Sequence, residues 1–340
     1  MYSLGLSVGK IRGLEQIADE SGIIRVVAMD QRGSLATMLN PAEPEKIGFN
    51  ELRDTKLILC KTLAPYCSAV LLDPQYGATQ AITENILPGK IGLIVSLEKS
   101  GFSGKPNTRL TEIIPGWSVE KIKRMGASAV KLLVYYNPGS ETAAITRELV
   151  SKVADECFFY DIPCLVETLV YPLKGDDNFP GYQKEKAGLV LQAAEDITDL
   201  GIDLYKAEFP LVPSNDIDHE KAFRLCSRLT ETAKVPWVIL SAGMEFEIFE
   251  KAVEIACKAG ASGFIAGRAI WKDAFKLPDK QRQLEYLNNQ AISNIKRLNE
   301  IATSYAHPWF KNIKAFETGK DWFNNYPGFD LSDARKAAGL

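Results

Sequence analysis

Short apolar runs recur along the chain at regular intervals, and polar stretches with helical periodicity separate them. The runs are rich in Val, Ile and Leu, which is typical of strands in a parallel sheet covered on both faces. This pattern predicts eight strands: Ile24–Asp30, Ser68–Asp73, Ile91–Glu98, Ala129–Tyr136, Pro163–Val170, Ile202–Phe209, Pro236–Gly243 and Gly263–Ile270.

The segments between these runs favour helices. Ser118–Met125 and Glu247–Ala259 place apolar side chains three and four residues apart. Gly126, Gly201 and Gly260 stand where a helix would end before the next strand. Eight alternating strand–helix units predict the α/β class and a closed (β/α)8 TIM barrel, because a doubly wound open sheet seldom contains so many regular units.

The length fits one barrel domain that spans residues 1–340, since a barrel takes about 250 residues and no low-complexity linker divides the chain. Residues 1–22 are expected to form an N-terminal helical cap, with Gly9–Gly22 as a short helix across the bottom of the barrel. Residues 307–340 form a C-terminal extension rich in Trp, Phe and Tyr. We expect this extension to pack on the barrel or on a second subunit, and the protein to be a homo-oligomer.

Composition and charge exclude several functional classes. A net charge of −3 gives no electrostatic case for nucleic acid. No apolar run approaches the roughly 20 residues that span a bilayer, and residues 1–10 do not resemble a signal peptide. The six cysteines include no Cys-x-x-Cys pair, so we expect free, buried thiols and a cytoplasmic protein.

Histidine is scarce. His219 and His307 are the only two, they lie far apart in the chain, and both are expected near the surface. A catalytic zinc site usually needs two or three histidines, or thiolates at short spacing. We therefore expect neither a metal nor another cofactor, and a Ser-His-Asp arrangement is disfavoured for the same reason.

Lys206 interrupts the apolar run Ile202–Phe209. A lysine there loses most of its hydration, so it must be paired with a carboxylate or be neutral. A neutral amine is a nucleophile that attacks carbonyl carbons to form Schiff bases. The alternative is a lysine whose stem is buried and whose ammonium reaches water at the end of the strand.

Other charged residues stand at the ends of predicted strands. Asp30, Asp73 and Glu98 end the first three strands, and Lys131 and Glu167 lie within the fourth and fifth. Each alone would fit a structural ion pair. Their convergence at the carboxyl ends of barrel strands, where catalysis takes place in this architecture, indicates an active site in which opposite charges shift one another's pKa values.

Small residues and an arginine follow the last two strands. Ser241-Ala242-Gly243 ends the seventh strand, and Gly267-Arg268 lies at the eighth. Loops at these positions often bind phosphate through backbone N–H groups, and the arginine fork suits phosphate oxygens. A turn glycine beside a surface arginine is the alternative.

Taken together, these segments resemble one known family. Met29–Ser34, Leu71–Gly77, Ala129–Tyr136, Lys206-x-Glu208, Leu240–Gly243 and Gly267–Ala269 occur in one order. They are similar to the tagatose-1,6-bisphosphate aldolase family of class I, Schiff-base aldolases. The similarity extends from about Val26 to Trp309, which is most of the chain.

The resemblance implies a metal-independent barrel that reversibly cleaves a ketose 1,6-bisphosphate, foremost tagatose 1,6-bisphosphate, into dihydroxyacetone phosphate and glyceraldehyde 3-phosphate. Lys206 matches the Schiff-base lysine, and Glu167 matches the acid/base. Lys131 and Asp30 match residues that line the reacting carbon. The residues that match positions near the phosphate of the dihydroxyacetone phosphate half are Gln31, Ser241, Gly243, Gly267 and Arg268.

Three alternatives remain open. The strands from Pro236 to Trp271 also look like those of aldolases that cleave 6-deoxy-6-sulfofructose 1-phosphate, and the segments Tyr171–Gln183 and Trp271–Leu284 match no pattern closely, so the distal end of the substrate is open. A non-catalytic sugar-phosphate sensor is a second alternative. A metal-dependent aldolase is the third, which the scarcity of histidine disfavours.

Overall fold

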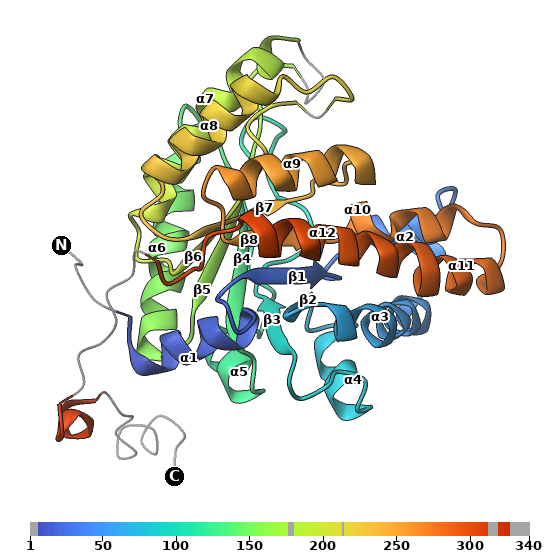
Figure 1. Ribbon diagram of the computed structural model, residues 1–340, viewed down its shortest axis with the longest axis horizontal. Coiled ribbons are helices and arrows are strands. Elements are labelled where there is room, and N and C mark those ends of the chain that lie inside the picture. The colour runs from blue at the N-terminus through green and yellow to red at the C-terminus, as the bar shows by residue number, and fades with distance from the viewer. Residues whose placement is uncertain (1–5, 176–179, 213, 312–318, 327–340) are drawn as a thin grey trace.

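The apolar runs form a closed barrel in the computed structural model, which describes residues 6–175, 180–212, 214–311 and 319–326 (Figure 1). Eight strands pair in parallel in chain order, and the last pairs with the first. They are β1 (Ile24–Ala28), β2 (Ala69–Leu72), β3 (Gly92–Ser96), β4 (Ala129–Tyr136), β5 (Cys164–Val170), β6 (Leu204–Ala207), β7 (Trp237–Leu240) and β8 (Gly263–Ala266). The predicted (β/α)8 TIM barrel is confirmed.

The α-helices surround the barrel on its outer face, apart from α1, which covers one end of it (Figure 1). They are α1 (Val8–Ile17), α2 (Gly33–Leu39), α3 (Phe49–Leu63), α4 (Ala78–Thr83), α5 (Val119–Arg124), α6 (Ala143–Phe159), α7 (Pro180–Thr198), α8 (His219–Thr232), α9 (Phe246–Lys258), α10 (Arg268–Trp271), α11 (Lys280–Tyr286) and α12 (Ile292–Tyr305). Gly126, Gly201 and Gly260 follow α5, α7 and α9 with φ values of +87°, +81° and +115°. These three glycines therefore end helices as predicted, in a conformation that other residues rarely adopt.

Alternate side chains of the strands point to two apolar cores. One core fills the barrel interior and the other lies between the strands and the helices. The interior core includes Val26 and Ile94 from the strands, Leu14 and Ile17 from α1, and Trp309 from the segment after α12. Helix α1 and Trp309 thus bury apolar surface that the short strands leave at one end of the barrel.

Six of the eight strands end earlier than the sequence pattern indicates, β2 by one residue and β1, β3, β6, β7 and β8 by two to four. β1 ends at Ala28, β7 at Leu240 and β8 at Ala266, whereas the predicted ends were Asp30, Gly243 and Ile270. After β7 the chain turns sharply, because Ala242 and Gly243 have φ values of +44° and +76°. After β8, residues 268–271 form the short helix α10. The polar residues that end these runs consequently lie in loops, outside the ladder of the sheet.

The described part of the C-terminal segment contacts the N-terminal helix. The Tyr326 hydroxyl accepts the Gly9 N–H at 3.0 Å and also contacts Asp161. Phe316 and Phe329 of the predicted extension lie outside the described residues. Across the part of the chain that the structure describes, no helix combines the length and the apolar character needed to cross a membrane.

The six cysteines are buried, and none forms a disulfide, which confirms the prediction of free thiols. Burial raises the pKa of Cys60, Cys67, Cys226 and Cys257 to about 12. These four thiols therefore stay protonated and unreactive at neutral pH.

Candidate active site

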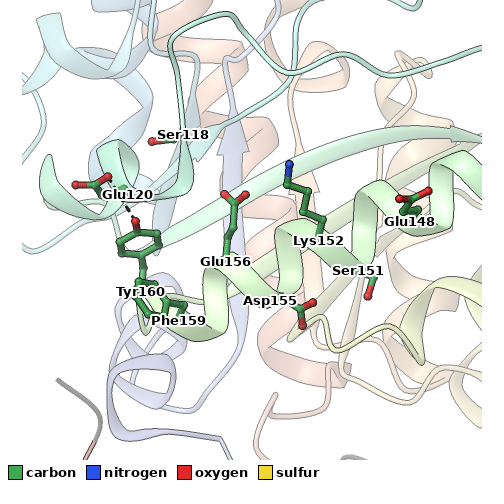
Figure 2. Close-up of a pocket in the computed structure, with 9 residues that line it drawn as sticks. All are labelled: Ser118, Glu120, Glu148, Ser151, Lys152, Asp155, Glu156, Phe159 and Tyr160. Atoms are coloured by element: carbon green, nitrogen blue, oxygen red, sulfur yellow. Dashed lines mark hydrogen bonds between the residues drawn. The ribbon is translucent and has the colours of Figure 1, made fainter. Parts of the chain in front are cut away.

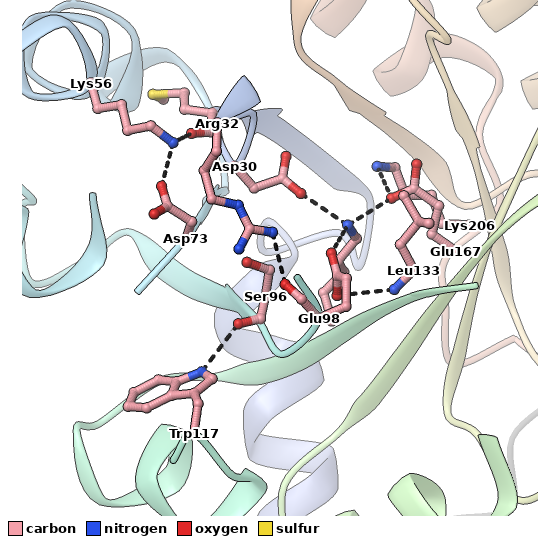
Figure 3. Close-up of polar contacts among 12 residues, drawn as sticks. Asp30, Arg32, Lys56, Asp73, Ser96, Glu98, Trp117, Leu133, Glu167 and Lys206 are labelled. Atoms are coloured by element: carbon pink, nitrogen blue, oxygen red, sulfur yellow. Dashed lines mark hydrogen bonds and ion pairs between the residues drawn. The ribbon is translucent and has the colours of Figure 1, made fainter. Parts of the chain in front are cut away.

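Lys206 and Glu167 lie side by side on adjacent strands. They are partners in the register of β5 and β6, and the Lys206 Nζ lies 2.8 Å from the Glu167 Oε2 (Figure 3). Both side chains are buried. The sequence pattern of one charged residue in each of two neighbouring apolar strands therefore produces a buried lysine–carboxylate pair, and Lys206 does not reach out to water.

Lys131 of β4 is the hub of this ionic network. Its Nζ lies 2.7 Å from the Glu98 Oε1, 2.9 Å from the Asp30 Oδ2 and 3.1 Å from the Glu167 Oε2. The four residues predicted to be catalytic, Lys206, Glu167, Lys131 and Asp30, are thus brought together by four elements that are far apart in the sequence. Glu98, predicted only to stand at the end of a strand, joins them.

The charges in the network determine its pKa values. Burial by itself disfavours the ammonium of Lys131, but Asp30, Glu167 and Glu98 outweigh it and raise the pKa of Lys131 well above the usual range. Burial by itself would raise the pKa of Asp30 and of Glu167. The positive charges of Lys131 and Lys206 outweigh that effect and lower both pKa values. At neutral pH these two carboxylates are therefore ionised, and the neighbouring ammonium groups stabilise that form.

Asp73 does not contact Lys131, contrary to the idea that every strand-end charge converges on one network. It pairs with Lys56 of α3, and both side chains are fully buried. The Lys56 Nζ also donates to the Met29 carbonyl at 2.8 Å. The pair therefore supports the backbone just before Asp30. Lys56 was not predicted to belong to the site, and its charge at a core position of α3 is the only signal in the sequence that could have indicated it.

The five residues predicted near the phosphate lie together in the segments that follow β1, β7 and β8, and Arg268 is the first residue of α10. The Gly267 N–H faces the Ser241 Oγ at 3.5 Å. A Cβ on Gly243 would lie 3.4 Å from the Arg268 Cζ, and a Cβ on Gly267 would lie 2.6 Å from the Ala28 carbonyl oxygen and 3.0 Å from the Gln31 Nε2. Any side chain at 267 would collide with β1, so glycine is required there.

Two polar side chains in these segments lack partners among the described residues. The Gln31 Oε1 is shielded from solvent and has no hydrogen-bond partner among the described residues. The Arg268 side chain is half-buried, and within the same part of the chain no carboxylate forms an ion pair with it. Donor and acceptor groups thus line these loops next to the strand that carries Lys206.

A surface groove lies elsewhere, between α5 and α6. Its lining includes Glu120, Lys152, Asp155, Glu156 and Tyr160, and it contains none of the predicted site residues (Figure 2). The Tyr160 hydroxyl donates to Glu120 at 3.4 Å across this groove. The groove lies against the outer helices, so it is separate from the carboxyl ends of the strands where the buried charges gather.

Comparison with solved structures supports the architecture. A fructose-bisphosphate aldolase from Plasmodium falciparum superposes with a TM-score of 0.69 at 13% identity, covering 89% of this chain and 98% of that one. An archaeal fructose 1,6-bisphosphate aldolase superposes with a TM-score of 0.55 at 22% identity, covering 84% and 98%. At these identities the likeness concerns the fold alone.

Comparison with sequences is more specific. A tagatose 1,6-diphosphate aldolase of Listeria monocytogenes serotype 4a is 31% identical over 334 residues, which cover 92% of this chain and 97% of that protein. Tagatose 1,6-diphosphate aldolase 2 of Streptococcus agalactiae serotype III is 30% identical over 329 residues, covering 91% and 99%. The profile of the DeoC/LacD family aldolases matches residues 24–273, which contain the whole barrel from β1 to β8. The chain belongs to the DeoC/LacD family of aldolases.

Proposed function

We propose that this protein is a class I aldolase that reversibly cleaves tagatose 1,6-bisphosphate into dihydroxyacetone phosphate and glyceraldehyde 3-phosphate. The observation that carries the proposal is the buried Lys206, whose Nζ lies 2.8 Å from the Glu167 Oε2 within the barrel of a DeoC/LacD family aldolase. A lysine placed this way exchanges a proton with its neighbour and then attacks a carbonyl carbon. The two relatives described above, named for tagatose 1,6-diphosphate, support the choice of sugar.

In the first step Lys206 gives a proton to Glu167 and attacks the ketone carbon of the sugar. The resulting carbinolamine loses its hydroxyl group as water when Glu167 returns a proton to that oxygen. The product is an iminium ion, and its positive charge lies beside the carboxylate of Glu167. That arrangement stabilises the ion in a site from which water is largely excluded.

In the second step an ionised carboxylate of the network, Asp30 or Glu167, removes the proton of the C4 hydroxyl. The electrons of the C3–C4 bond move into the iminium, which becomes an enamine, and the aldehyde leaves. The ammonium of Lys131 compensates the negative charge that develops on the C4 oxygen. Protonation of the enamine and hydrolysis of the iminium then release dihydroxyacetone phosphate and the free lysine.

Arg268 is proposed to bind the phosphate next to the carbon that Lys206 attacks. A charge-assisted hydrogen bond contributes about 1.5–3 kcal/mol, so Arg268→Ala should lower kcat/KM by roughly 10- to 150-fold. The loss should be equal for ketose 1-phosphates and for bisphosphates, because both carry this phosphate. Arg282→Ala, which removes an exposed arginine of α11, is the control. A loss confined to bisphosphates would move Arg268 to the distal end of the substrate.

The choice of sugar is tested by a panel of substrates in an assay coupled to aldehyde release. Tagatose 1,6-bisphosphate should be cleaved with a higher kcat/KM than fructose 1,6-bisphosphate, which differs in configuration at C4, and than 6-deoxy-6-sulfofructose 1-phosphate. Preference for the sulfonated sugar would replace the proposed substrate and retain the mechanism. Absence of cleavage across the panel would favour the sugar-phosphate sensor.

A further inference from the structure

The Glu98 carboxylate connects the end of β3 to the middle of β4 and holds Lys131. It follows β3, where its Oε1 accepts from the Lys131 Nζ at 2.7 Å and its Oε2 accepts the Leu133 N–H of β4 at 3.0 Å (Figure 3). The side chain is only 4% exposed. Among the three carboxylates around Lys131, Glu98 has the shortest contact with the ammonium.

The backbone of Glu98 is itself held in place. Its carbonyl oxygen accepts from the Arg32 Nη2 at 2.8 Å, and the preceding Leu97 N–H donates to the Lys131 carbonyl at 2.9 Å. Arg32 lies two residues after Asp30. The same short segment after β1 therefore supplies a carboxylate that pairs with Lys131 and a guanidinium that donates to the backbone of Glu98. The segments that carry Asp30, Glu98 and Lys131 are therefore mutually constrained before any substrate binds.

We propose that Glu98 is a positioning residue, which acts on the aldol cleavage through Lys131 by holding its ammonium where the C4 oxygen of the substrate is bound. This inference rests on the proposed aldolase function. It goes beyond the assignments made from the sequence, which give roles to Lys131 and Asp30 and none to Glu98.

The two partners of Glu98 make the carboxylate hard to replace. The ammonium of Lys131 and the N–H of Leu133 both donate, so both need an acceptor. A carboxylate supplies two acceptor oxygens, whereas the amide of glutamine supplies one oxygen and one NH₂ donor. Glu98→Gln must therefore give up one of the two contacts, although the size and shape of the side chain hardly change.

The charge of Glu98 should also affect how the activity of the enzyme depends on pH. After burial, the carboxylates Asp30, Glu167 and Glu98 are what hold the pKa of Lys131 well above its usual range. Removing one of these charges lowers the pKa of Lys131. If the mechanism needs the ammonium form, activity should then be lost at a lower pH on the alkaline side.

A matched control exists at the opposite end of the barrel. Asp203, at the start of β6, is also buried, pairs with a buried lysine and accepts an N–H from the neighbouring strand. Its oxygens lie 3.0 and 2.8 Å from the Lys10 Nζ and 2.8 Å from the Cys164 N. Asp203→Asn thus removes the same kind of interaction without touching Lys131.

The test compares Glu98→Gln with Asp203→Asn in the full-length protein, by steady-state kinetics across pH and by thermal unfolding. Glu98→Gln should lower kcat by about 10- to 100-fold, with KM changed less than about threefold, and shift the alkaline limb of kcat to lower pH. Asp203→Asn should keep kcat and its pH profile while lowering the unfolding temperature. Glu98→Asp, which keeps the charge, should restore the alkaline limb, and it substitutes if the glutamine variant does not fold.

Normal kcat and an unchanged pH profile in Glu98→Gln would overturn the positioning role. Equal losses of kcat in the Glu98 and Asp203 variants would also overturn it, because both would then reflect a loosened barrel. Failure of the aldolase proposal is distinct. In that case the unaltered protein itself would cleave no ketose phosphate and would form no borohydride-trapped adduct with dihydroxyacetone phosphate.

Discussion

Replacement of Lys206 by methionine should abolish aldol cleavage, with a loss in kcat/KM of at least about 10⁴-fold. Methionine fills a similar volume but has no nitrogen to form the iminium that takes up the electrons of the C3–C4 bond. The barrel should still fold, because Glu167 keeps a second cationic partner in Lys131, whose Nζ lies 3.1 Å from the same oxygen. Steady-state assays and thermal unfolding measure the two effects separately.

The identity of the reactive lysine is measured by trapping. Borohydride with dihydroxyacetone phosphate should add a reduced adduct to Lys206, which peptide mass mapping locates, and Lys206→Met should give no adduct. Lys186→Met is the matched control, because Lys186 is also buried and paired with a glutamate, Glu208, at 3.2 Å. Recovery of the adduct on Lys131 in the unaltered protein would contradict the assignment.

The barrel could be predicted from the sequence because its signals are local. Apolar runs such as Ala129–Tyr136 are buried on both faces of a parallel sheet, and the glycines at 126, 201 and 260 end helices at predictable places. The strand ends were harder to predict. After β8 the sequence continues with the apolar residues of α10. Only the structure shows that strand pairing stops at Ala266 and that a helix begins after Gly267.

The site could be predicted only in part, because its partners are set by register and packing. A charged residue in a buried strand indicates Lys206, Glu167 and Lys131 from local sequence. Nothing local distinguishes Glu98, which binds Lys131, from Asp73, which pairs with Lys56 and supports the Met29 carbonyl. Both are acidic residues at strand ends, and which lysine each one meets depends on how distant segments pack.

Glu167→Gln should lower kcat by about 10²–10⁴-fold and leave the fold nearly intact, since the two side chains have the same shape. The carboxylate contacts both Lys206 and Lys131, and the lysines keep its pKa low, so it is ionised at neutral pH and has a free site for the proton that Lys206 must lose. An amide accepts no such proton. Loss of water from the carbinolamine should also slow, so the rate of borohydride trapping on Lys206 should fall together with kcat.

Glu208→Gln removes another buried carboxylate, one that pairs with Lys186, and should change neither rate. Near-normal turnover of Glu167→Gln would reduce Glu167 to a structural partner of the two lysines, and the proton transfers would then have to be assigned to Asp30.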